Sequence, residues 1–140
     1  MTLLDVGMWL AAVWGGHIHH PVVAAWFEQQ SQGLVLCRVT QMSLLRLLSN
    51  PAVMRADGVD RSGAWHVIDE LRADSRVTWA DEPRHIEPIW RALSAREDSS
   101  HKLWTDDYLA SFAQAADLTL ATLDGAYAAR YPSVRVETLR

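Results

Sequence analysis

The sequence predicts a three-layer α/β/α domain around a central, mostly parallel sheet of about five strands. Short apolar, β-branched segments alternate along the chain with segments of helical periodicity, which is the pattern of strand–helix–strand crossovers. Two strand-like segments, 34–37 and 118–122, do not alternate apolar and polar residues, as expected of strands covered on both faces. A chain of 140 residues has the length of one ordinary domain, so residues 1–140 are expected to form a single domain.

Five short segments are expected to form the strands. Each is apolar and rich in β-branched or leucine residues, and each is bounded by polar or turn-forming residues. The segments are 3–6, 34–37, 76–79, 118–122 and 134–136.

Helices are expected between these strands. Pro21 favours a helix that starts at residue 20, and Thr40 is expected to cap a helix that stops before Pro51. The last long helix is expected to begin at Thr105. Two further segments, 64–71 and 86–93, carry apolar stripes at helical spacing. Three tryptophans on apolar helix faces are expected in the core: Trp26, Trp65 and Trp90.

Composition and charge exclude several classes of protein. Hydrophobic residues make up 49% of the chain and charged residues 21%, which excludes a disordered or collagen-like chain. The formal net charge of −4 argues against a protein that binds nucleic acid by basic charge alone. One cysteine, Cys37, excludes an internal disulfide framework and a zinc ribbon.

The first residues do not have the pattern of a targeting signal. They are apolar but contain Asp5 and have no basic region before it. No stretch reaches the ~18 apolar residues of a membrane span. We therefore expect a cytoplasmic protein that does not associate with a membrane.

Five polar side chains are expected at one edge of the sheet. Asp5 lies near the end of the first strand, and Asp124 directly follows the fourth. Asp106 and Asp107 begin the helix before that strand, and Gln41 begins the helix after the second. Carboxyl ends of parallel strands and the starts of crossover helices share an edge, where ligands bind. Clustered carboxylates repel one another, and a bound Mg²⁺ or Mn²⁺ ion would relieve that repulsion.

Each of these residues also has a purely structural interpretation. Asp106 and Asp107 stabilise a helix start through its dipole, and Asp124 with Gly125 suits an ordinary turn. Asp5 fits this interpretation least, because a charged residue within a buried strand is rarely left unpaired. From the pattern alone, a metal site and a set of separate structural acids are both open.

Three segments resemble the PIN-domain ribonucleases, and among them the VapC-type toxins of bacterial toxin–antitoxin pairs. Residues 3–27 (LLDVGMWLAAVWGGHIHHPVVAAWF) resemble the opening strand and helix of the family. Residues 37–53 (CRVTQMSLLRLLSNPAV) resemble the segment that usually holds its second acid. Residues 103–127 (LWTDDYLASFAQAADLTLATLDGAY) resemble the helix and strand with the third and fourth acids. The resemblance covers nearly the whole chain.

The resemblance assigns site residues by position. Asp5, Asp106 and Asp124 match three of the family's metal-binding acids, and Asp107 stands beside the second of them. Gln41 stands where an acid is expected, which removes one negative charge from the site. A further departure lies at Gly7, where the family commonly has Asn.

The resemblance also implies an activity. It implies metal-dependent hydrolysis of RNA by Mg²⁺ or Mn²⁺, with Asp5, Asp106 and Asp124 as ligands and Gln41 near the phosphate or a water molecule. The products would carry a 5′-phosphate and a 3′-hydroxyl. The partners would be a cognate VapB-type antitoxin, the RNA substrate, and a second copy in a homodimer or toxin–antitoxin hetero-oligomer.

Two other hypotheses remain at this point. Gln41 and Gly7 leave open a catalytically weakened PIN-like module that acts mainly by binding antitoxin or RNA. A phosphoacceptor receiver domain would also gather acids at one sheet edge. That class needs an acid pair near the first strand and a late lysine, whereas Asp5 stands alone and the only lysine, Lys102, precedes Asp106.

Overall fold

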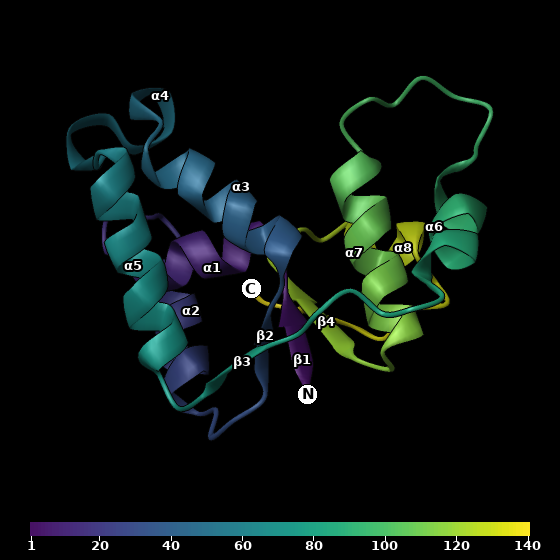
Figure 1. Ribbon diagram of the computed structural model, residues 1–140, viewed down its shortest axis with the longest axis horizontal. Coiled ribbons are helices and arrows are strands. Elements are labelled where there is room, and N and C mark those ends of the chain that lie inside the picture. The colour runs from purple at the N-terminus through teal and green to yellow at the C-terminus, as the bar shows by residue number, and fades with distance from the viewer.

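The computed structural model describes residues 1–140 and has a five-stranded sheet between two layers of helices (Figure 1). The strand order is β3-β2-β1-β4-β5, and all four neighbouring pairs are parallel. The predicted α/β/α fold is therefore confirmed. The strands are β1 (Thr2–Leu4), β2 (Leu34–Leu36), β3 (Val77–Trp79), β4 (Thr119–Thr122) and β5 (Val136–Thr138).

Eight α-helices connect and follow the strands. On one face of the sheet lie α1, α2, α3 and α5, and on the other lie α6, α7 and α8 (Figure 1). A short 3₁₀ turn, Arg55–Asp57, follows α4. The helices are α1 (Val6–Val13), α2 (His20–Glu28), α3 (Arg38–Leu48), α4 (Pro51–Met54), α5 (Arg61–Ala73), α6 (Ile86–Ser94), α7 (Trp104–Ala115) and α8 (Tyr127–Arg130).

The sheet separates two apolar cores. Successive strand residues point to opposite faces, so Leu3 packs in one core and Leu4 in the other. The core under α1, α2, α3 and α5 contains Trp9, whereas the core under α7 and α8 contains Phe112. Burial on both faces explains why the strand segments show no polar alternation.

Several element boundaries differ from the sequence-based expectation. The first strand ends at Leu4, and Asp5 is the N-cap of α1 rather than a residue inside the strand. Cys37, not Thr40, is the N-cap of α3, because the Thr40 hydroxyl bonds back to the Cys37 backbone and completes a capping box. Trp65 is 49% exposed, because α5 buries the neighbouring Ala64 instead.

The predicted fifth strand is also displaced along the chain. It begins two residues later than expected and pairs Val136 with Leu120 of β4. No helix has both the length and the apolar character needed to cross a membrane.

The order in which strands are added to the sheet reverses between β1 and β4. From β1 the strands proceed through β2 to β3, and β4 and β5 then add on the other side of β1. Ligands of open parallel sheets bind at the carboxyl ends of the strands beside such a reversal. Asp5 and Asp124 follow these two strands.

Candidate functional site

Asp5 is held at the carboxyl end of β1 by two hydrogen bonds. Its Oδ1 accepts from the Met8 backbone N–H at 2.9 Å, which caps the first turn of α1. Its Oδ2 accepts from the Thr122 hydroxyl at the end of β4. The side chain is fixed from both strands at the reversal point, and each oxygen keeps a lone pair for another partner.

Thr122 joins two of the predicted acids. Its buried hydroxyl donates to Asp5 and accepts from the Asp124 backbone N–H at 3.0 Å. Thr122 was not among the predicted site residues, because threonine is an ordinary strand residue. Its place two residues before Asp124 was the available signal, since threonine hydroxyls often bond a backbone N–H two residues on.

Arg130 brings Asp106 and Asp124 together. Its Nη2 lies 3.2 Å from Asp106 Oδ2 and 2.8 Å from Asp124 Oδ2. Asp106 is in the first turn of α7, and Asp124 lies in the loop after β4. Arg130 was not among the predicted site residues either, because its role depends on how α8 packs beside α7.

The pKa values of the three aspartates are shifted in different directions. Burial raises the pKa of Asp106 to about 6, and the charges of Asp5 and Asp124 add to the rise that Arg130 opposes. Burial also raises the pKa of Asp5, against the lowering effect of its hydrogen bond from Thr122. By contrast, the hydrogen bond from Arg130 holds the pKa of Asp124 below its usual range. Such shifts are typical of functional carboxylates.

Asp107, the fourth predicted acid, faces a different partner. It is buried, and the Tyr131 hydroxyl donates to its Oδ1. Neighbouring helix residues point about 100° apart, so Asp106 and Asp107 do not lie side by side. The structure thus brings three of the predicted acids together and pairs the fourth with Tyr131.

Gln41 and Gly7 differ in how they relate to the three aspartates. Gln41 is buried in the first turns of α3, and its Oε1 accepts from Arg38 Nη1 at 2.5 Å. No hydrogen bond joins Gln41 to Asp5, Asp106 or Asp124. A Cβ added at Gly7 would lie 3.4 Å from Asp5 Oδ1, so a side chain at position 7 would border that carboxylate.

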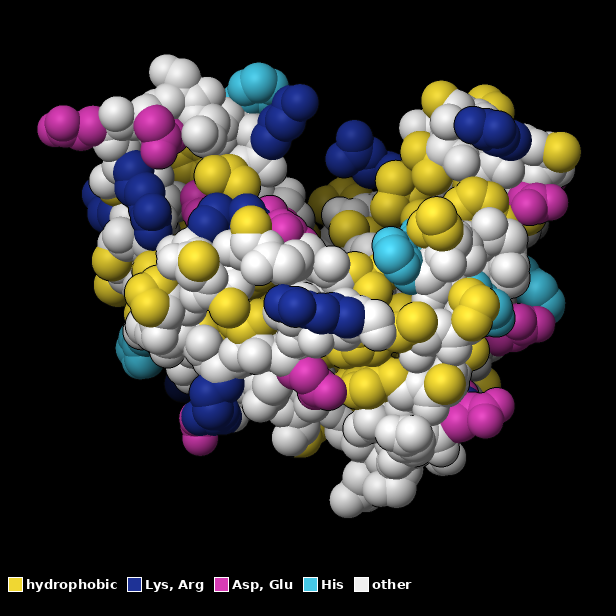
Figure 2. Space-filling view, turned by 180° about the vertical axis from the view of Figure 1, so that it is seen from behind, with side chains coloured by type: hydrophobic (Ala, Val, Ile, Leu, Met, Phe, Trp, Pro, Cys, Tyr) yellow, Lys and Arg dark blue, Asp and Glu magenta, His cyan; other side chains and the backbone are white.

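A polar groove opens at Asp106. A hollow of about 580 Å³ extends from the start of α1 and α7 along α3 and α4. Arg46, Thr105 and Asn50 contribute polar side chains to its lining. Figure 2 shows the molecule hollowed between two lobes, with Lys and Arg side chains on both sides. Arg46 is the basic residue that lines this groove.

Comparison with known proteins identifies the family. The family model of the PIN domain matches residues 2–131. The chain belongs to the PIN domain family. The PIN domain is 38% identical over 133 residues to Ribonuclease VapC41 of Mycobacterium tuberculosis, and the match covers 91% of each chain.

Solved structures support the same fold. The PIN domain superposes on a chain of VapBC2 from Rickettsia felis, solved bound to a promoter DNA fragment, with a TM-score of 0.71. The match has 14% identity and covers 99% of this chain and 98% of the other. Mycobacterium tuberculosis VapC20, described as a sarcin-ricin loop cleaving toxin, matches with a TM-score of 0.68 and 17% identity, over 96% and 99% of the two chains.

The acidic residues of the PIN domain offer the kind of donor atoms that a divalent cation prefers. Carboxylate oxygens are the ligands that Mg²⁺ and Mn²⁺ prefer. Burial, with a smaller contribution from neighbouring carboxylates, raises the pKa of Asp5 and Asp106, and a bound cation would favour their charged forms. As the side chains stand, no group of three or more His, Cys, Asp or Glu residues is arranged around one ion position. Arg130 instead supplies the positive charge between Asp106 and Asp124.

Replacing Tyr131 by Phe is expected to destabilise the PIN domain by about 1–3 kcal/mol, because it leaves a buried carboxylate without a donor. Tyr131 is 1% exposed, and Asp107 is 8% exposed. Urea unfolding measures the change. Tyr108→Phe is the matched control, because Tyr108 donates to the exposed Glu82. Equal unfolding free energies for both variants would contradict the assigned role.

Proposed function

We propose that this PIN domain, formed by residues 1–140, is a divalent-metal-dependent endoribonuclease of the VapC type that is neutralised by a VapB-type antitoxin. The observation that carries the proposal is the series of contacts at the β1–β4 reversal that links Asp5 to Asp124 through Thr122, and Asp124 to Asp106 through Arg130. The 38% identity to a protein named Ribonuclease VapC41 supports RNA as the substrate. The cytoplasm, where the RNA is, is the proposed place of action.

Three aspartates would hold the metal ion. Asp5 is fixed by Met8 and Thr122, whereas Asp106 and Asp124 would turn from Arg130 to the cation. When bound, Mg²⁺ or Mn²⁺ supplies positive charge that stabilises the phosphate and lowers the pKa of a water molecule.

The remaining residues would bind and orient the RNA. Once Asp106 and Asp124 turn to the cation, the guanidinium of Arg130 would be free to donate to a phosphate oxygen of RNA bound beside them. Arg46 and Thr105 line the groove that ends at Asp106, and they offer donors to neighbouring phosphates. A chain with a net charge of −4 needs such local positive charge to bind RNA.

We propose that Gln41 holds Arg38 in place and does not bind the metal ion. Its amide oxygen is engaged by Arg38, whose guanidinium also lies 4.8 Å from the centre of the Trp79 ring. A glutamate at position 41 would form an ion pair with the same arginine. The missing charge at position 41 therefore leaves the three aspartates as the proposed ligand set.

The proposed protein partner is a cognate VapB-type antitoxin. VapBC2 of Rickettsia felis and VapBC of Salmonella typhimurium are both complexes solved on DNA, and both share this fold. We propose that this chain likewise forms a toxin–antitoxin hetero-oligomer, or a homodimer when the antitoxin is absent.

Cleavage of a mixture of tRNA and ribosomal RNA tests the proposal. Purified protein free of antitoxin is incubated with Mg²⁺, with Mn²⁺ or with EDTA, beside the Asp106→Asn variant. We expect cutting that needs the metal and is lost in the variant. Folded wild-type protein that cuts no RNA with either metal would refute the nuclease and favour the weakened binding module.

Thr122→Val is expected to lower the cleavage rate about 10- to 100-fold, as is typical for residues that orient metal ligands. Valine keeps the shape and strand propensity of threonine but removes the hydroxyl that joins Asp5 to the Asp124 backbone. Thr119→Val, at the other end of β4, is the matched control and should cut at the wild-type rate. A Thr122→Val rate within twofold of wild type would show that the hydroxyl does not position the acids.

A further inference from the structure

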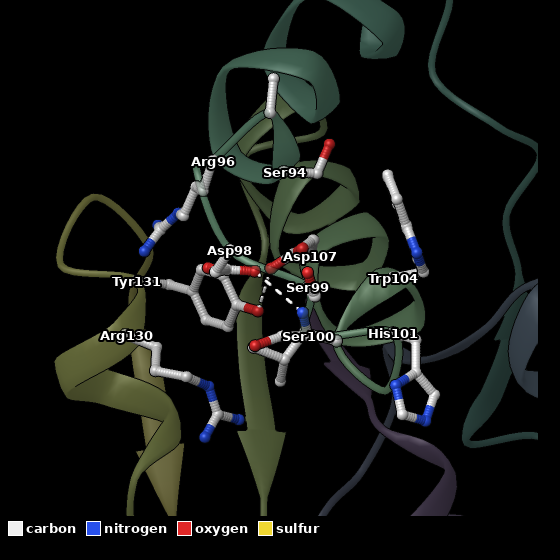
Figure 3. Close-up of a pocket in the computed structure, with 12 residues that line it drawn as sticks. Ser94, Arg96, Asp98, Ser99, Ser100, His101, Trp104, Asp107, Arg130 and Tyr131 are labelled. Carbon is white, nitrogen blue, oxygen red and sulfur yellow. Dashed lines mark hydrogen bonds between the residues drawn. The ribbon is translucent and has the colours of Figure 1, made fainter.

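A second hollow lies beside Arg130. This loop pocket has a volume of about 320 Å³ and lies between the α6–α7 loop (residues 95–103), the start of α7 and α8. Figure 3 shows Arg130 and Tyr131 on one side, and His101 and Trp104 on the other. Its volume is at the small end of the range for small-molecule sites.

The loop pocket shares Arg130 with the acidic site. Arg130 lines the pocket and also bonds Asp106 and Asp124 through Nη2. Trp104, at the start of α7, lies two residues before Asp106 in the same helical turn. A nucleic acid whose phosphate lies at the three aspartates therefore has an adjoining nucleotide within reach of this pocket.

Trp104 forms an exposed and well-supported aromatic surface there. It is 55% exposed, and its ring packs edge-to-face on Trp90 with centroids 6.4 Å apart. Trp90 in turn packs on Tyr108 at 5.5 Å. Exposed aromatic rings next to a backbone-binding groove are the surfaces on which single-stranded bases stack.

The other lining residues suit the edge of a base better than a phosphate. Arg96 offers the donors that its bond to the Leu93 carbonyl leaves over, and Asp98 offers the oxygen that does not accept from the Ser100 backbone. His101 and Ser99 also line the pocket, and their side chains make no hydrogen bond within the chain. The lining combines the guanidinium groups of Arg96 and Arg130 with the carboxylate of Asp98, and a phosphate, which only accepts hydrogen bonds, matches only part of this mixture. A base edge carries donors and acceptors together and can pair with both kinds of group.

We propose that the loop pocket binds an unpaired nucleobase next to the cleaved phosphodiester, with Trp104 as its stacking surface. The proposal rests on the proposed function, because it takes RNA as the ligand of the neighbouring acids. It makes the α6–α7 loop a determinant of which single-stranded RNA segments are cut.

Binding without cleavage tests the pocket directly. The probe is a fluorescein-labelled, single-stranded RNA octamer of mixed sequence, titrated with full-length protein in EDTA and followed by fluorescence anisotropy. Trp104→Ala is expected to weaken binding about 5- to 100-fold, the usual effect of losing one stacking residue. Trp104→Phe should restore most of the affinity, whereas Trp104→Leu, which keeps apolar packing on Trp90, should not.

The matched control is Trp65→Ala, because Trp65 is 49% exposed on α5 and lines neither hollow. This variant should bind the octamer within twofold of wild type. A ribose-phosphate chain of the same length without bases should bind wild type and Trp104→Ala equally. Equal octamer affinity of wild type and Trp104→Ala, or no octamer binding by wild type, overturns the base pocket.

Cleavage in Mg²⁺ or Mn²⁺ separates this proposal from the proposed function. Trp104-dependent binding by a protein that cuts no RNA would refute the nuclease and leave the pocket. Metal-dependent cutting that is unchanged in Trp104→Ala, together with unchanged binding, would refute the pocket and leave the nuclease.

Discussion

Asp5→Asn is expected to lower metal-dependent RNA cleavage on the order of 10²- to 10⁴-fold, because it removes a charge that contributes several kcal/mol of metal-based stabilisation. The amide oxygen of asparagine still accepts the hydrogen bond from the Met8 backbone, and asparagine is as good an N-cap as aspartate. Its NH₂ group takes the place of the oxygen that accepts from Thr122, and it can donate to that hydroxyl instead. The helix start is therefore retained, and the lost charge is the main change. The measurement is the initial rate of RNA cleavage at saturating Mg²⁺.

The chain offers a matched control for this substitution. Asp60 is the N-cap of α5 and accepts from the Gly63 backbone N–H at 2.7 Å, as Asp5 does from Met8. Asp60 lies outside the acidic site and the groove, so Asp60→Asn should cut RNA within twofold of the wild-type rate. Equal rates for the Asp5 and Asp60 variants would mean that Asp5 is a helix cap and not a metal ligand.

The sequence predicted the layers of this fold well because strand burial leaves a strong local signal. Leu3 and Leu4, or Val35 and Leu36, pack on opposite faces of the sheet, so apolar runs without alternation indicated covered strands. The positions of the acids followed from that topology. Boundaries were less accurate, because the N-cap at Asp5 depends on one side-chain bond to Met8 and not on periodicity.

The parts of the site that the sequence did not predict depend on contacts between distant segments. Thr122 bonds Asp5 across 117 positions of sequence, and Tyr131 bonds Asp107 across 24. Helical geometry alone separates Asp106 from Asp107, so the division of that pair was predictable in principle. Which of the two aspartates faces Arg130 depends on how α8 packs against α7, and the local sequence does not show that packing.

A divalent cation at 100 times its dissociation constant is expected to raise the melting temperature of the wild type by roughly 10 °C, since such binding adds about 2.7 kcal/mol. Burial is the main cause of the raised pKa values of Asp5 and Asp106, and repulsion from neighbouring carboxylates adds to it. A bound cation would favour the charged form of both groups. Thermal unfolding with MnCl₂ and with EDTA measures the difference. The Asp5→Asn and Asp106→Asn variants should lose most of the shift, and an equal shift in all three proteins would place the ion elsewhere.

In EDTA at pH 7, Asp106→Asn and Asp124→Asn are expected to change stability in opposite directions, by roughly 1–3 °C each. The pKa of Asp106 is raised to about 6, so its stabilising contribution is present at low pH and lost as pH rises through 6. Removing that charge at pH 7 should raise the melting temperature.

The pKa of Asp124 is lowered by Arg130, so its contribution is fully present at pH 7 and is lost only in acid. Asp124→Asn should therefore lower the melting temperature, and the loss should disappear as the pH falls towards the lowered pKa. Added metal should then remove the advantage of Asp106→Asn, because the wild type gains a cation that the variant binds weakly. A melting temperature lowered by both substitutions in EDTA would mean that Arg130 fully compensates both carboxylates without a metal ion.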